Sequence, residues 1–278
     1  MKKFPIALQL YSVRDNLARD FEGTLRQVAQ MGYDGVEFAG LYGKSGEEVK
    51  RITDELGLKV ISAHVPLAEM VADPEGVFAL YKSLGCAYVA VPYLPESGRP
   101  VVGDFEKTVK TVTELALKAK EAGLTLLYHN HDFEFVKMEN GRYGLDELYT
   151  RVPADLLETE IDTCWVNVAG VDPAAYVEQY TGRAPVVHLK DFVMPGKKPA
   201  KMYALIGIDD GEEQKEEEAF SFRPVGYGAQ KMEDILAACE KAGSLWLVVE
   251  QDAPSMGLTP MECAAKSRAY LQIGRAHV

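Results

Sequence analysis

The chain has 278 residues, of which 47% are hydrophobic and 26% are charged, and its formal net charge is −12. This composition is ordinary for a globular protein with a sizeable core, and the length allows one large domain or two small ones. The acidic balance argues against a protein that binds nucleic acid, because such proteins present a basic surface to the phosphate backbone. Half of the charge is local, since residues 209–218 (DDGEEQKEEE) contain seven acids and one lysine.

Membrane and secretion signals are not expected in this sequence. Its apolar runs are no longer than a strand, which excludes a membrane span. The first residues, MKKFPIALQL, contain two lysines, but Pro5 and Gln9 interrupt the apolar stretch that a signal peptide needs. The four cysteines are far apart and form no CxxC pair, which favours reduced thiols over a disulfide framework or a zinc ribbon. We therefore expect a cytoplasmic protein.

Short apolar runs alternate with helical patterns along the whole chain. The runs predicted as strands are 6–11, 35–38, 59–64, 88–93, 124–131, 156–162, 185–191 and 245–252. Helical spacing is found at 21–32, 45–57, 105–123, 231–243 and 259–272. In the helix predicted over 105–123, Asp104 is the expected N-cap and Gly123 the expected residue after the C-cap. The apolar face of this helix consists of Val109, Val112, Leu115, Ala116 and Ala119.

Eight strand–helix units in a chain of this length predict a single (β/α)8 TIM barrel over residues 1–272. A doubly wound open sheet is the alternative, but no GxGxxG follows a strand and no P-loop is present. The one long interruption, at about 192–229, follows the seventh strand and is expected on the catalytic face. It is interpreted as a lid or substrate loop, or, in its acidic part, as a disordered decoration. Residues 273–278 (IGRAHV) match a translated sequencing adapter and are expected to be non-native, so His277 is left out of the site.

Polar residues collect at the carboxyl ends of the predicted strands, where the active sites of TIM barrels lie. They are Gln9, Tyr11, Glu37, His64, His129, His131, Glu160, Asp162, His188, Lys190, Glu250 and Asp252. Pairs spaced by two residues share one face of a strand, and we expect that face to point into the barrel because outward positions meet helices.

Each of these residues taken alone has a structural interpretation. His64 would be a hydrogen-bonded histidine at a strand end, Asp162 a turn cap and Lys190 the partner in a salt bridge. Their coincidence on neighbouring strands favours a functional site. Two imidazoles and two carboxylates make a mixed nitrogen and oxygen site for a divalent metal, with positions left open for a substrate.

With these motifs the chain resembles the xylose-isomerase-like sugar phosphate isomerase/epimerase superfamily, from LQLYSVRD to VVEQD. The most specific matches are IDTCWVNVAGVDP, VVHLKDF, PVGYG and VVEQD. The resemblance implies a TIM barrel and one divalent metal held by residues of the fifth to eighth strands. In this chain the implied ligands are His129, Asp162, His188 and Glu250. Mn²⁺ is the first expectation for the metal, and Co²⁺, Zn²⁺, Fe²⁺ and Mg²⁺ are the alternatives.

Two positions depart from the family pattern. Ketose epimerases of the family have a glutamate as the fifth-strand ligand and second catalytic base, where this chain has His129. The family's DTGH after the sixth strand is DTCW here, so that Trp165 replaces a histidine. The stretch YHNHDFEF, an HNHxxEF variant, is similar to a subgroup that includes inosose dehydratases and hydratases or lyases of 3-keto-sugars.

These enzymes and the isomerases share one step, the removal of a proton next to a carbonyl. The expected activity is therefore that of a metal-dependent sugar isomerase or epimerase. The alternative is a dehydratase, hydratase or lyase of the inosose or 3-keto-glycoside type. A metal-free sugar-binding or partner-subunit role is a more distant alternative.

The resemblance also implies roles for the remaining residues. Glu250 would serve as general base in addition to binding the metal. His131 with Glu134 would be its acid–base partner, or His131 would exchange roles with His129. Lys190 would stabilise negative charge that develops on the substrate. The residues expected to contact the sugar are Gln9, Glu37, His64 and Trp165.

Other activities of this fold explain the sequence less well. Endonuclease-IV-type enzymes hydrolyse nucleic acid with a three-metal cluster that needs more histidine and glutamate ligands than these strands provide. A Schiff-base aldolase would use Lys190 and would leave the carboxylates without a role. We therefore expect a small sugar or sugar derivative as partner, with neither nucleic acid nor membrane. The sequence leaves a homo-oligomer open.

Overall fold

Eight parallel strands form the wall of a barrel in the computed structural model, which describes residues 3–196 and 220–273. They are β1 (Ile6–Gln9), β2 (Gly35–Phe38), β3 (Lys59–Ala63), β4 (Tyr88–Val91), β5 (Thr125–His129), β6 (Leu157–Asp162), β7 (Val186–Leu189) and β10 (Trp246–Val249). Their hydrogen-bonded order is β3-β2-β1-β10-β7-β6-β5-β4. A parallel bridge between His64 and Ala90 links β3 to β4 and closes the ring. The predicted (β/α)8 TIM barrel is confirmed.

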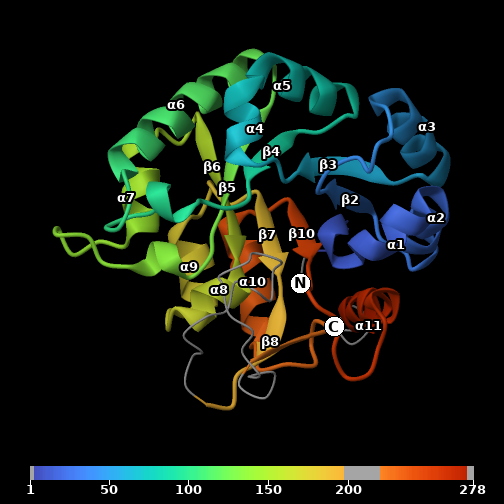
Figure 1. The fold of residues 1–278 in the computed structure, drawn as a ribbon. Coiled ribbons are helices and arrows are strands. Elements are labelled where there is room, and N and C mark those ends of the chain that lie inside the picture. The colour runs from blue at the N-terminus through green and yellow to red at the C-terminus, as the bar shows by residue number, and fades with distance from the viewer. Residues whose placement is uncertain (1–2, 197–219, 274–278) are drawn as a thin grey trace.

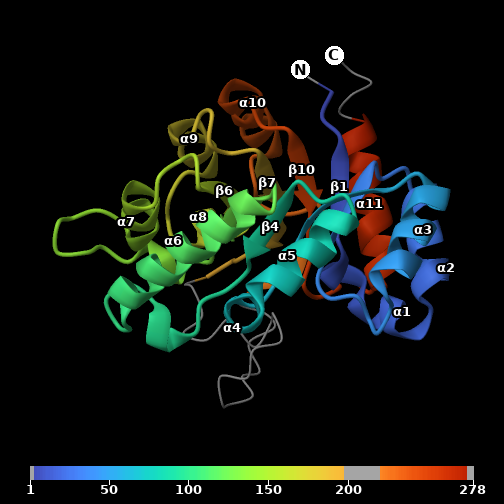
Figure 2. The ribbon, with the colours of Figure 1, turned by 90° about the horizontal axis from the view of Figure 1, so that it is seen from above.

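Helices surround the strands on the outside of the barrel (Figures 1 and 2). They are α1 (Arg14–Arg19), α2 (Phe21–Gln30), α3 (Gly46–Leu56), α4 (Leu67–Ala72), α5 (Pro74–Ser83), α6 (Phe105–Glu121), α7 (Gly144–Arg151), α8 (Thr163–Val168), α9 (Pro173–Gln179), α10 (Met232–Ala242) and α11 (Pro260–Ile273). Short 3₁₀ helices lie at Leu10–Val13, Glu96–Gly98 and Phe133–Phe135. All five helical segments predicted from the sequence are present.

Helix α6 shows how the sequence pattern becomes packing. Its predicted apolar face is buried, together with Phe105 and Thr108. The Asp104 side chain accepts a hydrogen bond of 3.0 Å from the backbone N–H of Lys107, which makes Asp104 the N-cap. Gly123 has a φ of +74°, a backbone conformation that side chains with a Cβ rarely adopt. Both predicted ends of this helix are confirmed.

Inside the barrel, side chains alternate along each strand between the interior and the surrounding helices. The layer nearest the amino ends of the strands is apolar and contains Ala7, Ile61, Tyr88, Ala90, Leu127, Val186 and Val248. Two residues further along their strands lie Gln9, His129, His188 and Glu250. The apolar layer therefore fills the amino-terminal end of the barrel, and the polar residues lie next to it toward the carboxyl ends of the strands.

Most strands end earlier than predicted, because the chain turns over the mouth of the barrel where the polar residues begin. Strand β7 ends at Leu189 and β10 at Val249, so Lys190 and Glu250 follow their strands directly. Tyr11 lies in the 3₁₀ helix after β1.

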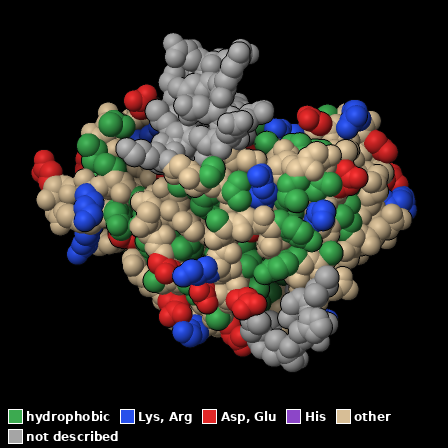
Figure 3. Space-filling model, turned by 90° about the horizontal axis from the view of Figure 1, so that it is seen from below, with side chains coloured by type: hydrophobic (Ala, Val, Ile, Leu, Met, Phe, Trp, Pro, Cys, Tyr) green, Lys and Arg blue, Asp and Glu red, His purple; other side chains and the backbone are tan. Residues whose placement is uncertain are grey.

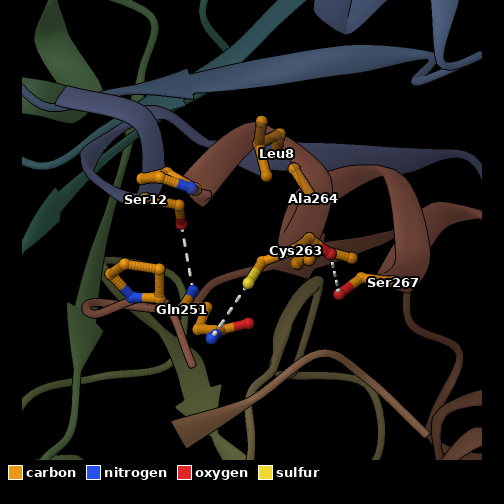
Figure 4. Close-up of a pocket in the computed structure, with 9 residues that line it drawn as sticks. Leu8, Ser12, Gln251, Cys263, Ala264 and Ser267 are labelled. Atoms are coloured by element: carbon orange, nitrogen blue, oxygen red, sulfur yellow. Dashed lines mark hydrogen bonds between the residues drawn. The ribbon is translucent and has the colours of Figure 1, made fainter. Parts of the chain in front are cut away.

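Helix α11 packs beside β10 and the 3₁₀ helix Leu10–Val13 that follows β1, and a close-up of this contact is shown in Figure 4. The backbone N–H of Gln251 donates to Ser12 Oγ at 3.0 Å, and the Ser267 hydroxyl donates to the Cys263 carbonyl at 3.0 Å. The space between these residues is about 10 Å³, the smallest volume that holds one water molecule. This region is a packing contact rather than a ligand site. All four cysteines are buried free thiols.

The surface seen in Figure 3 carries scattered acidic and basic side chains between apolar ones, and its described residues form no broad basic area. Within residues 3–196 and 220–273, no helix combines the length and apolar character needed to cross a bilayer.

A short antiparallel pair, β8 (Asp191–Val193) and β9 (Ser221–Arg223), lies at the base of the predicted interruption at 192–229. The acidic stretch 209–218 and residues 274–278 lie outside the described residues. The buried Asp191 carboxylate joins the two ends of the interruption, because it accepts hydrogen bonds of 2.9–3.1 Å from the backbone N–H groups of Phe192, Gly226, Gly228 and Gln230.

We expect Asp191→Ala to lower the free energy of unfolding by about 3 kcal/mol or more, because four backbone N–H groups lose a charged acceptor. Urea unfolding followed by circular dichroism measures this loss. The matched control is Asp104→Ala, which removes the acceptor of one backbone N–H at a helix end and should cost about 1 kcal/mol. Equal losses in the two variants would contradict the role of Asp191.

Candidate metal centre

Four side chains from neighbouring strands converge at the carboxyl end of the barrel. They are His129 of β5, Asp162 of β6, His188 of β7 and Glu250 directly after β10, here called the upper ligand set. One donor atom of each residue lies within 4.8 Å of the donor atoms of the other three. Donor atoms on opposite sides of a metal ion, each bound at about 2.1 Å, are about 4.2 Å apart, so a small contraction lets the set hold one ion. The structure thus brings together the four residues that the family resemblance implied.

Asp162 caps a helix with one carboxylate oxygen and directs the other toward the upper ligand set, and its role as a metal ligand stays a prediction. Its Oδ1 caps helix α8 by accepting hydrogen bonds from the backbone N–H groups of Cys164 at 2.8 Å and Trp165 at 3.1 Å. Its buried Oδ2 accepts no hydrogen bond and lies 3.6 Å from His129 Nε2 and 3.1 Å from Lys190 Nζ. The Lys190 ammonium compensates the charge of this buried oxygen, and a metal ion bound by the set would place a second positive charge beside it.

His129 and His131 differ in their position relative to this centre. His129 belongs to the upper ligand set, whereas His131 does not. Burial, together with His188 and His64 nearby, lowers the pKa of His129 well below its ordinary value. Its ring is therefore neutral and keeps a lone pair for a metal. The ring of His131 is parallel to that of Phe133, with centroids 5.6 Å apart, and lies on the cavity wall. This geometry supports His129 as the ligand.

Lys190 lies among three carboxylates of the site. Its Nζ is 3.1 Å from Asp162 Oδ2, 3.0 Å from Glu250 Oε2 and 3.0 Å from Asp252 Oδ2. Burial would lower the pKa of Lys190, but these negative charges outweigh burial and hold that pKa well above its ordinary value. The ammonium is therefore charged, and it contacts two members of the upper ligand set.

Glu134, the expected acid–base partner, lies in the 3₁₀ helix Phe133–Phe135 and is buried. Its Oε1 accepts a hydrogen bond from the Tyr128 hydroxyl at 2.7 Å, and its Oε2 accepts one from the backbone N–H of His131 at 2.9 Å. It is not among the residues that line the cavity. These contacts hold the turn that carries His131, and the direct acid–base role of Glu134 stays a prediction.

Glu134 should make stability depend on pH. Burial raises its pKa to about 7 from an ordinary 4.5, although its hydrogen bonds lower it. Between these values the folded state keeps a proton that the unfolded chain has lost, so the free energy of unfolding falls as pH rises through this window. A shift of this size is worth about 3 kcal/mol. In Glu134→Gln this component is absent. The free energy of unfolding of the wild type and of Glu134→Gln is measured in urea at about pH 4 and about pH 8. The wild type should lose about 3 kcal/mol more than the variant between these two pH values. An equal change in both proteins would contradict the raised pKa of Glu134.

A cavity of about 490 Å³ opens beside the upper ligand set. Of the predicted site residues, those that line it are His64, His129, His131, Lys190 and Glu250. Residues of its wall that were not predicted as site residues are Tyr11, Glu69, Tyr81, Tyr93 and Asp252, together with small and apolar neighbours. Tyr11 and Asp252 could have been predicted as site residues, because each lies two positions after a polar residue at a strand end, Gln9 and Glu250 respectively.

Three residues expected to contact the sugar lie behind the cavity wall. Gln9, Glu37 and Trp165 are fully buried and are not among the lining residues. Trp165 packs with Cys164, Val168, Phe192, Phe220 and Phe222. Gln9 Nε2 donates a hydrogen bond of 2.7 Å to Glu37 Oε1. Their predicted contact with substrate stays a prediction, and the contacts observed for them are with other protein groups.

Comparison with known proteins agrees with this architecture. The chain matches the family model of the xylose isomerase-like TIM barrel over residues 25–272. The inosose dehydratase of Clostridium beijerinckii is 23% identical to it over 279 residues, which cover 91% of this chain and 89% of that protein.

Solved structures of similar proteins share the fold. A sugar phosphate isomerase/epimerase from Parabacteroides distasonis has a TM-score of 0.71 at 23% identity, with 98% of this chain and 94% of that chain covered. The crystal structure of the IOLI protein, which contains a bound zinc atom, has a TM-score of 0.74 at 16% identity and covers 98% of this chain and 97% of that chain.

Proposed function

The chain belongs to the xylose isomerase-like TIM barrel family, and we propose that it is a divalent-metal-dependent enzyme that removes a proton next to the carbonyl of a sugar-derived ketone. The observation that carries this proposal is the convergence of the upper ligand set beside a cavity of about 490 Å³. Two nitrogen and two oxygen ligands suit Mn²⁺, Co²⁺, Zn²⁺ or Fe²⁺. The zinc atom bound by the IOLI protein supports a metal in this family.

A bound divalent metal would draw electron density from the carbonyl oxygen of the ketone and make the neighbouring C–H bond more acidic. Glu250 is the proposed base. Burial would raise the pKa of Glu250, but the Lys190 charge and the His188 hydrogen bond hold it well below its ordinary value. The carboxylate is therefore ionised and able to accept a proton on the cavity wall.

The other polar residues of the cavity would bind and orient the ketone. Lys190 would donate a hydrogen bond to the oxygen on which negative charge develops. His64 and His131, which also line the cavity, would contact hydroxyl groups of the substrate.

Within this chemistry we propose dehydration as the reaction. Glu250 takes the proton from the carbon next to the carbonyl, the electron pair forms a carbon–carbon double bond, and the hydroxyl group on the following carbon leaves. The leaving hydroxyl takes up the proton from Glu250 and becomes water. Because the deprotonated carbon of an inosose itself carries a hydroxyl group, the other product is an enol, which rearranges to a diketone. One carboxylate on one face is sufficient for this sequence, and the fifth strand supplies His129 in place of a second one. The inosose dehydratase relatives, aligned over 91% of the chain, support it.

Epimerisation or isomerisation is the second candidate. It needs a group that returns the proton to carbon, and His131 is a histidine on the cavity wall with a pKa that burial and Lys190 lower well below its ordinary value. A neutral imidazole of this kind accepts and returns protons. The similarity to a sugar phosphate isomerase/epimerase supports this candidate.

Incubating the Mn²⁺-loaded protein with inososes, free ketoses and 3-keto-glycosides in D₂O separates the candidates. Dehydration predicts loss of water from an inosose, seen by NMR and by the ultraviolet absorbance of the product. Deuterium in recovered sugar without elimination would instead establish the epimerase. Release of an aglycone from a 3-keto-glycoside would establish the lyase. Neither deuterium exchange nor product with any of these compounds would contradict the proposed function.

A further inference from the structure

A second layer of polar residues lies beneath the upper ligand set. The two carboxylates of this layer, Glu37 of β2 and Glu160 of β6, are here called the lower carboxylates. Both are fully buried and neither lines the cavity. Gln9 donates to Glu37 Oε1 at 2.7 Å, and His64 Nε2 lies 2.6 Å from Glu160 Oε2. The lower carboxylates are thus held in place by side chains that belong to this layer.

Each histidine of the upper ligand set contacts both layers through its two ring nitrogens. His188 Nδ1 lies 2.8 Å from Glu250 Oε2, and its Nε2 lies 2.9 Å from Glu37 Oε1. His129 Nε2 lies 3.6 Å from Asp162 Oδ2, and its Nδ1 lies 3.2 Å from Glu160 Oε2. In both rings one nitrogen therefore lies beside the upper ligand set. The other, His188 Nε2 or His129 Nδ1, lies 2.9 or 3.2 Å from a lower carboxylate, and a small turn of the ring would complete a hydrogen bond that is not yet formed.

A neutral imidazole has one lone pair and one N–H group. When the lone pair binds a metal in the upper set, the N–H group points down to a carboxylate that can accept it. Carboxylates in this position fix the tautomer and the orientation of metal-binding histidines and make them stronger ligands.

The lower layer also offers donor atoms of its own, from His64, His129, Glu160 and His188, within 4.8 Å of one another. This group shares the rings of His129 and His188 with the upper set. Because a neutral imidazole has a single lone pair, each of these rings can bind a metal ion in only one of the two groups at a time. His64 of the lower group lines the cavity, but Glu160 does not, whereas Glu250 and Lys190 of the upper level both line it. An ion in the upper position would therefore lie beside both the proposed base and the ammonium.

We propose that Glu37 and Glu160 are positioning residues that accept the second N–H of His188 and His129, so that His188 binds the metal through Nδ1 and His129 through Nε2. This inference rests on the proposed metal-dependent function and assigns the lower carboxylates to the protein's own ligands instead of to sugar hydroxyls. Gln9 and His64 extend the arrangement by holding the two carboxylates.

The test compares Mn²⁺ affinity, measured by competition with a chelator, in the wild type, Glu37→Gln and Glu160→Gln. Each substitution keeps the side-chain shape and removes the charge, and each should weaken binding about 10- to 100-fold. The matched control is Glu158→Gln on the same face of β6, whose carboxylate makes no ion pair with a histidine among the described residues; it should bind Mn²⁺ like the wild type. The absorption spectrum of the Co²⁺-loaded protein should shift in the first two variants only. Thermal unfolding without metal shows whether each variant is folded.

Two further measurements separate this inference from the proposed function. Asp162→Asn removes a ligand of the upper set and should weaken Mn²⁺ binding more than either lower variant does. A wild type that binds no Mn²⁺ would overturn the proposed function together with the inference. Folded lower variants that bind Mn²⁺ as tightly as the wild type, while Asp162→Asn does not, would overturn the inference alone. Two equivalents of metal in the wild type, with one lost in Glu160→Gln, would also overturn it, because Glu160 would then be a ligand itself.

Discussion

Asp162→Asn is expected to lower activity about 10³-fold or more and to abolish tight metal binding. The loss follows because a metal supplies several kcal/mol of charge stabilisation in the transition state, and each 1.4 kcal/mol or so corresponds to about tenfold in rate. The fold should survive, because asparagine is as good a helix N-cap as aspartate and can keep the hydrogen bonds from Cys164 and Trp165. Steady-state rates and a Mn²⁺ titration measure the two effects.

The control for this variant is Asp172→Asn. Asp172 caps α9 through a hydrogen bond from the Ala175 backbone at 3.1 Å, and it does not belong to either group of candidate metal ligands. This variant should keep wild-type activity and metal affinity. Unchanged Mn²⁺ affinity in Asp162→Asn would remove Asp162 from the ligand set.

Lys190→Met is expected to change activity and metal affinity in opposite directions. Activity should fall about 10²- to 10³-fold, because a donor to the developing negative charge is lost. Metal affinity should rise about tenfold or more, because the ammonium that lies 3.1 Å from Asp162 and 3.0 Å from Glu250 no longer competes for these carboxylates or repels the ion. Rate measurements and a Mn²⁺ titration on the same preparation test both.

Lys190→Met should also change the free energy of unfolding. Without metal, the variant should lose about 3–5 kcal/mol, because buried carboxylates remain without their cation. Mn²⁺ should therefore raise its unfolding temperature more than that of the wild type. The control is Lys241→Met, which removes an exposed ion pair with Glu178 and should have little effect on stability. Activity and metal affinity that fall together would show that Lys190 supports metal binding instead of competing with it.

Much of the fold was predictable because its signals are local. Strands buried on both faces need continuous apolar runs, and the helices between them need apolar residues spaced three or four apart. Both patterns are visible in the sequence itself. Asp104 and Gly123 predicted the ends of α6 from cap chemistry alone. Polar residues at the ends of apolar runs indicated the region of the site, and the family resemblance then selected the four members of the upper ligand set, whose role as ligands stays a prediction.

The depth of each residue in the barrel was not predictable, because it depends on the register between strands. His129 pairs with Glu160 and Asp162 pairs with His188, so residues at apparently equivalent strand ends lie at different levels. A single strand carries no information about this stagger. For the same reason the sequence could not show that Gln9 and Glu37, which were expected to contact the sugar, are buried and do not line the cavity. Glu134 lies in a 3₁₀ turn, where no periodic pattern shows which way a side chain points.

The most direct test of the metal centre is anomalous scattering from crystals of the protein soaked in Mn²⁺. We expect one Mn²⁺ peak, bound by His129, Asp162, His188 and Glu250 and open to the cavity that Lys190 lines. The absence of a peak at this position, or a peak bound by His64 and Glu160 instead, would contradict it.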